Sequence, residues 1–124
     1  MERRIKDRGK DMCTRNQALD IFSQAYKMCG DLFADKLTDA YLYGSYARGD
    51  YDDESDIDIL VTVDMEPEAL ARLRSKVSAI NSELSLKHDI TVSITAKPLE
   101  QFRRYSDILP YYRNVIKEGV RYAG

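Results

Sequence analysis

Residues 41–63 contain the pattern that most constrains the fold of this chain. A short apolar run ends at Gly44-Ser45, and ten residues later Asp56 and Asp58 open a second, strongly β-prone run. Isoleucine or valine then occupies every second position as far as residue 63. This alternation predicts a strand that carries both aspartates on one face.

Two carboxylates on one strand face repel each other. At ~5 Å and an effective dielectric constant of ~20 the repulsion is roughly 3 kcal/mol, so full ionisation requires a cation. Hard oxygen ligands favour Mg²⁺ or Mn²⁺ over zinc. Gly44-Ser45, between a strand and a helical turn over 45–48, supplies backbone N–H groups and a hydroxyl that suit phosphate. The segment therefore predicts adjacent phosphate and metal sites, the combination that phosphoryl or nucleotidyl transfer needs.

The spacing of these residues resembles a known signature. Gly-Ser, ten residues and Asp-x-Asp before an apolar strand is similar to the motif of the DNA polymerase β-like nucleotidyltransferase superfamily. Gly-Ser-Tyr-Ala-Arg-Gly-Asp together with Ser-Asp-Ile-Asp-Ile-Leu-Val most resembles its minimal nucleotidyltransferase branch, whose members are often antitoxins encoded beside a HEPN-domain toxin. The resemblance is sharp over 41–63 and extends, in pattern, over about 15–118. It implies an α+β fold in which a small mixed β-sheet has helices packed mainly on one face.

Length and composition are consistent with one soluble domain. The chain has 124 residues, 44% of them hydrophobic, and 19 basic against 21 acidic side chains give a net charge of −2. This balance disfavours a long nucleic acid as partner. Cys13 and Cys29 lack metal-ligand spacing and predict free thiols in a reducing compartment. Without an apolar stretch of ~18 residues or a signal peptide, we expect a cytoplasmic protein that does not enter a membrane.

The pattern along the chain predicts a charged leader and one nucleotidyltransferase domain. Residues 1–14 are dense in charge and form either a disordered leader, an extra helical turn or a basic arm, and residues 15–124 form the domain. Hydrophobic periodicity predicts the following elements: helix 15–37, strand 40–43, strand 56–63, helix 67–84, strand 87–96, helix 98–104 and helix 106–118. We expect the last helix to bury Ile108, Leu109, Tyr112, Val115 and Ile116.

Asp89 lies at the start of the third predicted strand and is a candidate third carboxylate. If this strand pairs beside the second, Asp89 approaches Asp56 and Asp58, and in the resembled superfamily a strand carboxylate holds that place. The alternative is that Asp89 is a turn residue or a cap. His88, the only histidine, is expected to be a surface residue.

The resemblance implies an activity and roles for the site residues. ATP is the expected donor, and two Mg²⁺ ions (or Mn²⁺) are held by Asp56, Asp58 and Asp89, with Asp89 as candidate base for the attacking hydroxyl. Gly44 allows close backbone approach and Ser45 binds a terminal phosphate. Arg48 either clamps a phosphate or pairs with Asp50 or Asp53.

The chain is short for an enzyme that must also hold its acceptor. We therefore expect a partner protein to supply the acceptor hydroxyl for AMP transfer from ATP. The resemblance implies that this partner is a HEPN toxin that is adenylylated on a tyrosine, with the chain acting as its antitoxin. Alternatives are transfer to a small-molecule hydroxyl, with a homodimer completing the site, and a catalytically silent antitoxin that acts by binding alone. Tyrosines and arginines of the C-terminal quarter form either a partner surface or ordinary amphipathic packing: Tyr105, Tyr111, Tyr112, Tyr122, Arg103, Arg104 and Arg113.

Overall fold

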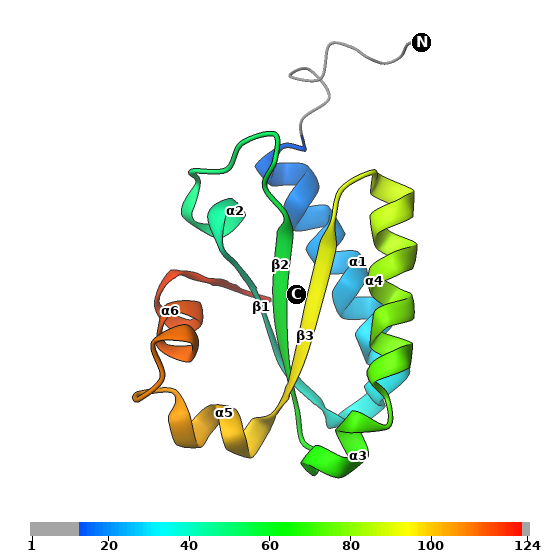
Figure 1. The fold of residues 1–124 in the computed structure, drawn as a ribbon, viewed down its shortest axis with the longest axis vertical. Coiled ribbons are helices and arrows are strands. Elements are labelled where there is room, and N and C mark those ends of the chain that lie inside the picture. Colours follow the sequence, from blue (N-terminus) through cyan, green and yellow to red (C-terminus); the bar gives the residue numbers. More distant parts are fainter. Residues whose placement is uncertain (1–12, 123–124) are drawn as a thin grey trace.

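The computed structural model describes residues 13–122, which form a four-stranded sheet flanked by helices (Figure 1). Residues 1–12 of the predicted leader lie outside this range. The strands are arranged in the order β3-β2-β1-β4. Strand β1 is antiparallel to β2 and to β4, and β2 is parallel to β3, so the sheet is mixed and the α+β prediction is confirmed. The strands are β1 (Leu37–Tyr43), β2 (Ile57–Val63), β3 (Val92–Pro98) and β4 (Val120–Arg121).

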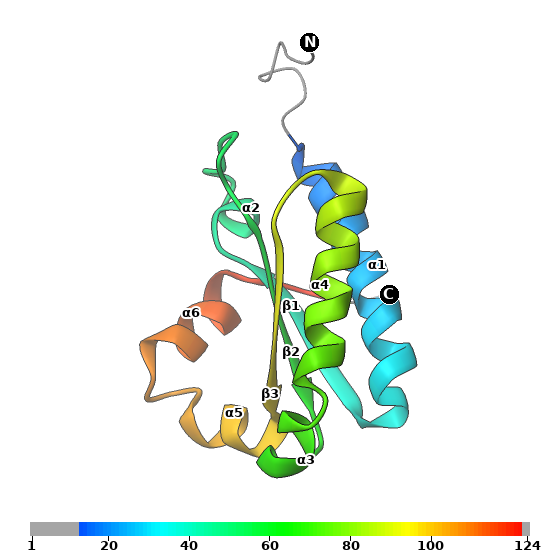
Figure 2. The ribbon, with the colours of Figure 1, turned by 45° about the vertical axis from the view of Figure 1, so that its right-hand side comes forward.

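Two long helices cover one face of the sheet, which we call the core face (Figure 2). Helix α1 (Arg15–Phe33) begins with a capping box, in which the Gln17 N–H donates to Thr14 Oγ1 and the Thr14 N–H donates to Gln17 Oε1. The 3₁₀ helix η2 (Ala34–Lys36) follows it, so the predicted helix ends in a tighter turn before β1. The second long helix, α4 (Arg74–His88), packs beside α1 and over β3.

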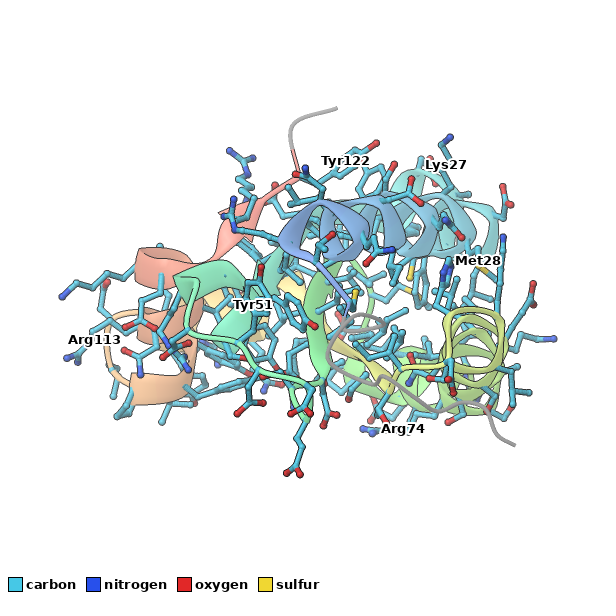
Figure 3. The ribbon with its side chains drawn as sticks, turned by 90° about the horizontal axis from the view of Figure 1, so that it is seen from above. Lys27, Met28, Tyr51, Arg74, Arg113 and Tyr122 are labelled. Carbon is cyan, nitrogen blue, oxygen red and sulfur yellow. The ribbon has the colours of Figure 1, made fainter. Side chains whose placement is uncertain are left out.

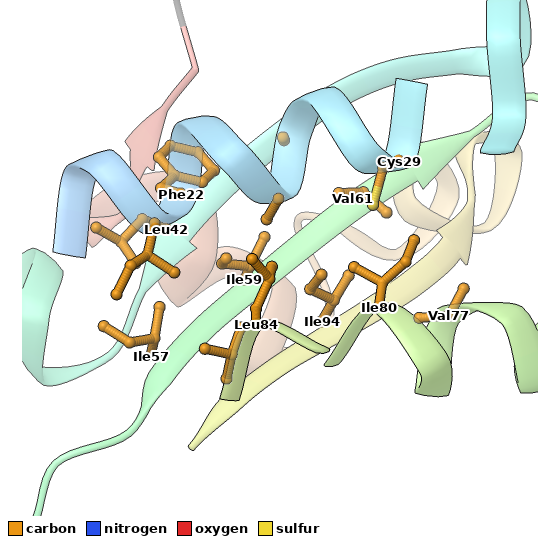
Figure 4. Packing of buried hydrophobic residues seen from close by; sticks show 14 of the residues in the cluster. Phe22, Cys29, Leu42, Ile57, Ile59, Val61, Val77, Ile80, Leu84 and Ile94 are labelled. Carbon is orange, nitrogen blue, oxygen red and sulfur yellow. The ribbon is translucent and has the colours of Figure 1, made fainter. Parts of the chain in front are cut away.

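Apolar side chains from both helices and three strands meet on the core face (Figure 4). The alternating residues of β2 are fully buried there, as their period predicts. Fully burying each such side chain stabilises the fold by about 1.5–3 kcal/mol. The labelled members are Phe22 and Cys29 of α1, Leu42 of β1, Ile57, Ile59 and Val61 of β2, Ile94 of β3, and Val77, Ile80 and Leu84 of α4.

The opposite face, which we call the site face because it carries Asp58, is partly covered by two shorter helices. Helices α5 (Leu99–Tyr105) and α6 (Pro110–Glu118) pack there through a small cluster of Leu60, Phe102, Tyr112 and Val115. The prediction for the last helix is partly wrong, because it begins at Pro110 after a turn. Only two of its expected core residues are buried, and the other three are exposed: Ile108 by 62%, Leu109 by 41% and Ile116 by 47%.

The segment between β2 and β3 also differs from the prediction. A break at Arg72-Leu73 divides the expected helix into α3 (Pro67–Ala71) and α4. Helix α4 then continues to His88, whose Nε2 lies 3.1 Å from Gln24 Oε1 of α1, so the strand predicted from residue 87 begins only at Val92. None of the helices within residues 13–122 combines the length and apolar character needed to cross a membrane.

Candidate active site

The turn between β1 and helix α2 (Ser45–Arg48) brings backbone directly against Asp58. Gly44 has a φ of +82°, and a Cβ at this position would lie 2.8 Å from Asp58 Oδ2. Tyr43, the last residue of β1, is paired with Asp58 in the ladder. Gly44 is therefore required both by its backbone conformation and by the space that Asp58 occupies. Ser45 follows at the start of the helical turn, where the first N–H groups have no partners within the helix.

The loop that leads from this turn to Asp56 is fixed by local contacts. Tyr46 is buried, donates its hydroxyl hydrogen to the Cys13 carbonyl oxygen over 2.9 Å, and stacks on Tyr51 at a centroid distance of 4.4 Å. Figure 3 shows Tyr51 within this loop, viewed from the end of the sheet where the turn lies. Further on, the Asp52 carboxylate accepts hydrogen bonds from the Glu54 N–H and the Ser55 hydroxyl. The tyrosines beside the turn thus hold the loop in place.

Asp56 lies just before β2 and Asp58 lies within it, and the two carboxylates differ in their exposure to solvent. Asp58 is half-buried, and burial first and the charge of Asp56 second raise the pKa of its carboxyl group. Asp56 is exposed. Within residues 13–122 neither carboxylate forms a salt bridge. Two hard oxygen donors that repel each other and lack a protein cation fit Mg²⁺ or Mn²⁺.

Arg48 lies at the end of α2 in two ion pairs. Its Nε is 3.3 Å from Asp50 Oδ2, and its Nη1 is 3.8 Å from Glu118 Oε1 of α6. The structure therefore shows the ion-pair alternative for Arg48, with Asp50 as the partner. The second pair links helix α2 to α6.

The structure does not bring Asp89 together with the other two aspartates. Asp89 is exposed and caps α4 in the left-handed region, with a φ of +53°, so its predicted place on a strand is wrong. No group of three or more acidic, histidine or cysteine side chains that could hold a metal ion is found in the described part of the chain. An aspartate tolerates the left-handed conformation better than most residues, which is why it serves as a cap here.

The sequence did not show which residues lie beside Asp58 on the site face. Tyr43 Oη lies 2.9 Å from Tyr111 Oη of α6, and burial, Tyr111 and Asp58 all raise the pKa of the Tyr43 hydroxyl. On β3, Ser93 is paired with Asp58. Strand alternation placed Ser93 on the wetter face, but only the strand register shows which residue neighbours Asp58.

A hollow of about 700 Å³ lies at the other end of the sheet, beyond the end of β2. Lys36, Asp64, Glu66 and Arg104 are among its lining residues, and none of the predicted site residues lines it. The candidate site is therefore the turn and carboxylate arrangement at the opposite end.

Comparison with known proteins identifies the family of this chain. A family model described as a nucleotidyltransferase domain matches residues 18–123. A candidate protein adenylyltransferase of Methanocaldococcus jannaschii is 40% identical over 77 residues, which are 62% of this chain and 76% of that protein. The chain belongs to the nucleotidyltransferase domain family and is a nucleotidyltransferase, as its motif predicts.

Solved structures support the same fold. A crystal structure of the toxin–antitoxin MntA–HpeT matches with a TM-score of 0.56 at 24% identity, covering 82% of this chain and 72% of that one. A structure of the tri-AMPylated Shewanella oneidensis HEPN toxin in complex with MNT antitoxin matches with a TM-score of 0.53 at 22% identity, covering 86% and 72%. At these identities the likeness establishes the fold alone.

Proposed function

We propose that this nucleotidyltransferase transfers AMP from ATP to a hydroxyl of a partner protein and acts as the antitoxin of a HEPN-domain toxin. The observation that carries the enzymatic part is the packing of the Gly44 backbone against Asp58, beside a helical turn that begins at Ser45. The partner is inferred from the relative named for protein adenylylation and from the toxin–antitoxin structures with this fold.

The site residues divide the chemistry between them. Asp56 and Asp58 would hold Mg²⁺ or Mn²⁺, which when bound neutralises triphosphate charge at the reacting phosphorus. Ser45 and the N–H groups at the start of α2 bind the terminal phosphates. The acceptor oxygen forms a bond to the α-phosphorus, the bond to pyrophosphate breaks, and the acceptor's proton leaves to solvent. Arg48 binds a phosphate only after giving up its contacts with Asp50 and Glu118.

An exposed surface on α5, α6 and the turn between them supports a protein acceptor. It contains five apolar or aromatic side chains that solvent reaches: Tyr105, Ile108, Leu109, Tyr111 and Ile116. This surface, which we call the α5–α6 surface, adjoins the site because Tyr111 bonds to Tyr43 and Glu118 pairs with Arg48. Arg113 points away from the body of the protein beside it (Figure 3). Tyrosine and arginine are enriched in the residues that dominate protein interfaces.

Labelled ATP tests the activity. The chain is incubated with Mg²⁺, ATP labelled at the α-phosphate and a HEPN-domain protein, and the product is measured by intact mass and by mapping of the modified residue. We expect AMP on a tyrosine of the HEPN protein, and none with the D56N/D58N variant. A stable complex without added mass would instead establish an antitoxin that acts by binding, and label on small molecules alone would contradict the protein acceptor.

A pair of surface variants tests where the acceptor docks. I108D places a charge on the α5–α6 surface. L86D places a charge at an 85% exposed leucine of α4, the helix that covers the core face. We expect I108D to weaken HEPN-protein binding by about tenfold or more and L86D to leave it unchanged. Equal effects of the two variants, or none from I108D, would contradict this surface.

A further inference from the structure

The in-register pairing of β2 and β3 determines which side chains neighbour the two aspartates. Asp58 is paired with Ser93, and the Ile57 N–H donates to the Thr91 carbonyl oxygen over 2.9 Å. Residues paired in a parallel ladder project to the same face of the sheet. Val92 and Ile94, on either side of Ser93, are buried in the core cluster. The half-buried Ser93 therefore stands on the site face, next to Asp58.

The third strand thus presents hydroxyls where a third carboxylate was expected. Thr91 lies just before β3, and Thr95 follows Ser93 on the same face of the strand. Asp89 lies outside the strand, in the turn after α4. The strand neighbours of Asp58 are consequently Tyr43 on one side and Ser93 on the other, and neither carries a charge at neutral pH.

We propose that Ser93 occupies the third-carboxylate position of this site, and that the chain holds one divalent ion tightly with its nucleotide and a second only weakly. Two carboxylates offset the charge of one divalent cation, and a second cation would have to share them against the repulsion of the first. A neutral hydroxyl is a weaker ligand for a hard cation than a carboxylate is. The inference rests on the proposed use of ATP and metal, but not on the identity of the acceptor.

Ion counting tests this without any turnover. Bound Mn²⁺ is titrated by electron paramagnetic resonance in the presence of a non-hydrolysable ATP analogue, with the wild type, S93D, S93N and D89N. We expect one tight Mn²⁺ in the wild type and a second that binds about tenfold more weakly or worse. S93D should tighten the second ion by about tenfold, while S93N, similar in size to S93D but neutral, should not. D89N should leave both affinities unchanged.

Thermal unfolding provides the folding control for S93D. A third carboxylate beside Asp58 lowers the unfolding temperature in chelator, and Mn²⁺ with the analogue should restore it. Two equally tight ions in the wild type, loss of one ion in D89N, or a folded S93D with wild-type affinities would each overturn the proposal. Failure of AMP transfer to a protein would leave these ion counts as expected, so it would count against the proposed function only.

Discussion

On the core face, every second residue of β2 is a buried isoleucine or valine, whereas on the site face the same strand presents Asp58 and then the buried Leu60 and Thr62. The core face is uniform along its length and is covered by α1 and α4. Along β2 the site face changes character. It is polar and open at the end that carries Asp58 and apolar beneath α5 and α6.

The core face supplies most of the stability of the fold, and the site face carries the groups proposed to do the chemistry. Apolar burial on the core face stabilises the fold in proportion to its area. Burial and the charge of Asp56 both raise the pKa of Asp58, so this carboxylate is held in an environment that disfavours its charged form. A site that binds a cation tolerates such repulsion because the cation removes it. Variants on the two faces of β2 should therefore fail in different ways.

The largest effect is expected from D58N, which removes a proposed metal ligand while keeping the side chain's size. We expect AMP transfer to fall about 1,000-fold, equivalent to about 4 kcal/mol in the activation free energy. The unfolding temperature in chelator should stay the same or rise, because the repulsion with Asp56 is removed. Transfer within tenfold of wild type would contradict the metal-ligand assignment.

The adjacent residue on the opposite face gives the matched contrast. Ile59 is fully buried in the core cluster, and I59A should lower the free energy of unfolding by about 3 kcal/mol in a denaturant titration. Transfer per folded molecule should change far less than in D58N. If I59A costs under about 1 kcal/mol, the core face is not the main source of stability.

The two glycines with positive φ that flank α2 provide a smaller and more selective comparison. A Cβ at Gly44 would lie 2.8 Å from Asp58 Oδ2, whereas a Cβ at Gly49 would meet nothing within 4 Å. G49A should cost about 1 kcal/mol, the backbone cost of a left-handed alanine, and should keep its activity. G44A should cost about 2–3 kcal/mol and should also slow transfer, because Asp58 must move. Equal losses of stability and activity in both would show that the Gly44 contact has no specific role.

The sequence alone predicts the core face of the sheet better than the site face. The core face follows from local periodicity, so α1, β2 and the apolar stripe that Ile59 represents were predicted within a few residues. Asp89 was placed on a strand because the predicted strand began at residue 87, five residues before β3 begins at Val92. The contact of His88 with Gln24, 64 positions earlier in the chain, accompanies the longer helix and cannot be read from local pattern.

The site face depends on pairings between distant segments. That Ser93 neighbours Asp58 is a matter of strand register, and the period-two pattern is the same for several registers. The bond between Tyr43 and Tyr111 joins residues 68 positions apart. Ile108 and Leu109 were expected in the core because they continue a helical apolar pattern, but the turn before Pro110 places them in solvent. Composition and periodicity do not determine where such a turn falls.

The smallest effect that we expect is a change in the free energy of unfolding with pH that results from the ionisation of Asp58. Because its pKa is raised in the folded protein, the folded state keeps a proton that the unfolded chain has already released. The resulting stability is fully present when the pH is below the pKa of an aspartate in the unfolded chain, about 3.9. It is lost as the pH rises through the raised pKa of Asp58 in the folded protein. In chelator, the difference in free energy of unfolding between wild type and D58N should therefore move against the wild type as the pH rises from about 4 to about 7.

Divalent ion should reverse the sign of that dependence. Metal binding requires ionised carboxylates, so with Mn²⁺ and the ATP analogue the wild type should gain stability over D58N across the same pH range. Urea titrations of both proteins at several pH values, with chelator and with metal, measure the two slopes. A difference between the proteins that is independent of pH in both conditions would mean that Asp58 has an ordinary carboxyl environment. The site face of β2 would then not differ from the core face by holding an aspartate whose pKa is raised.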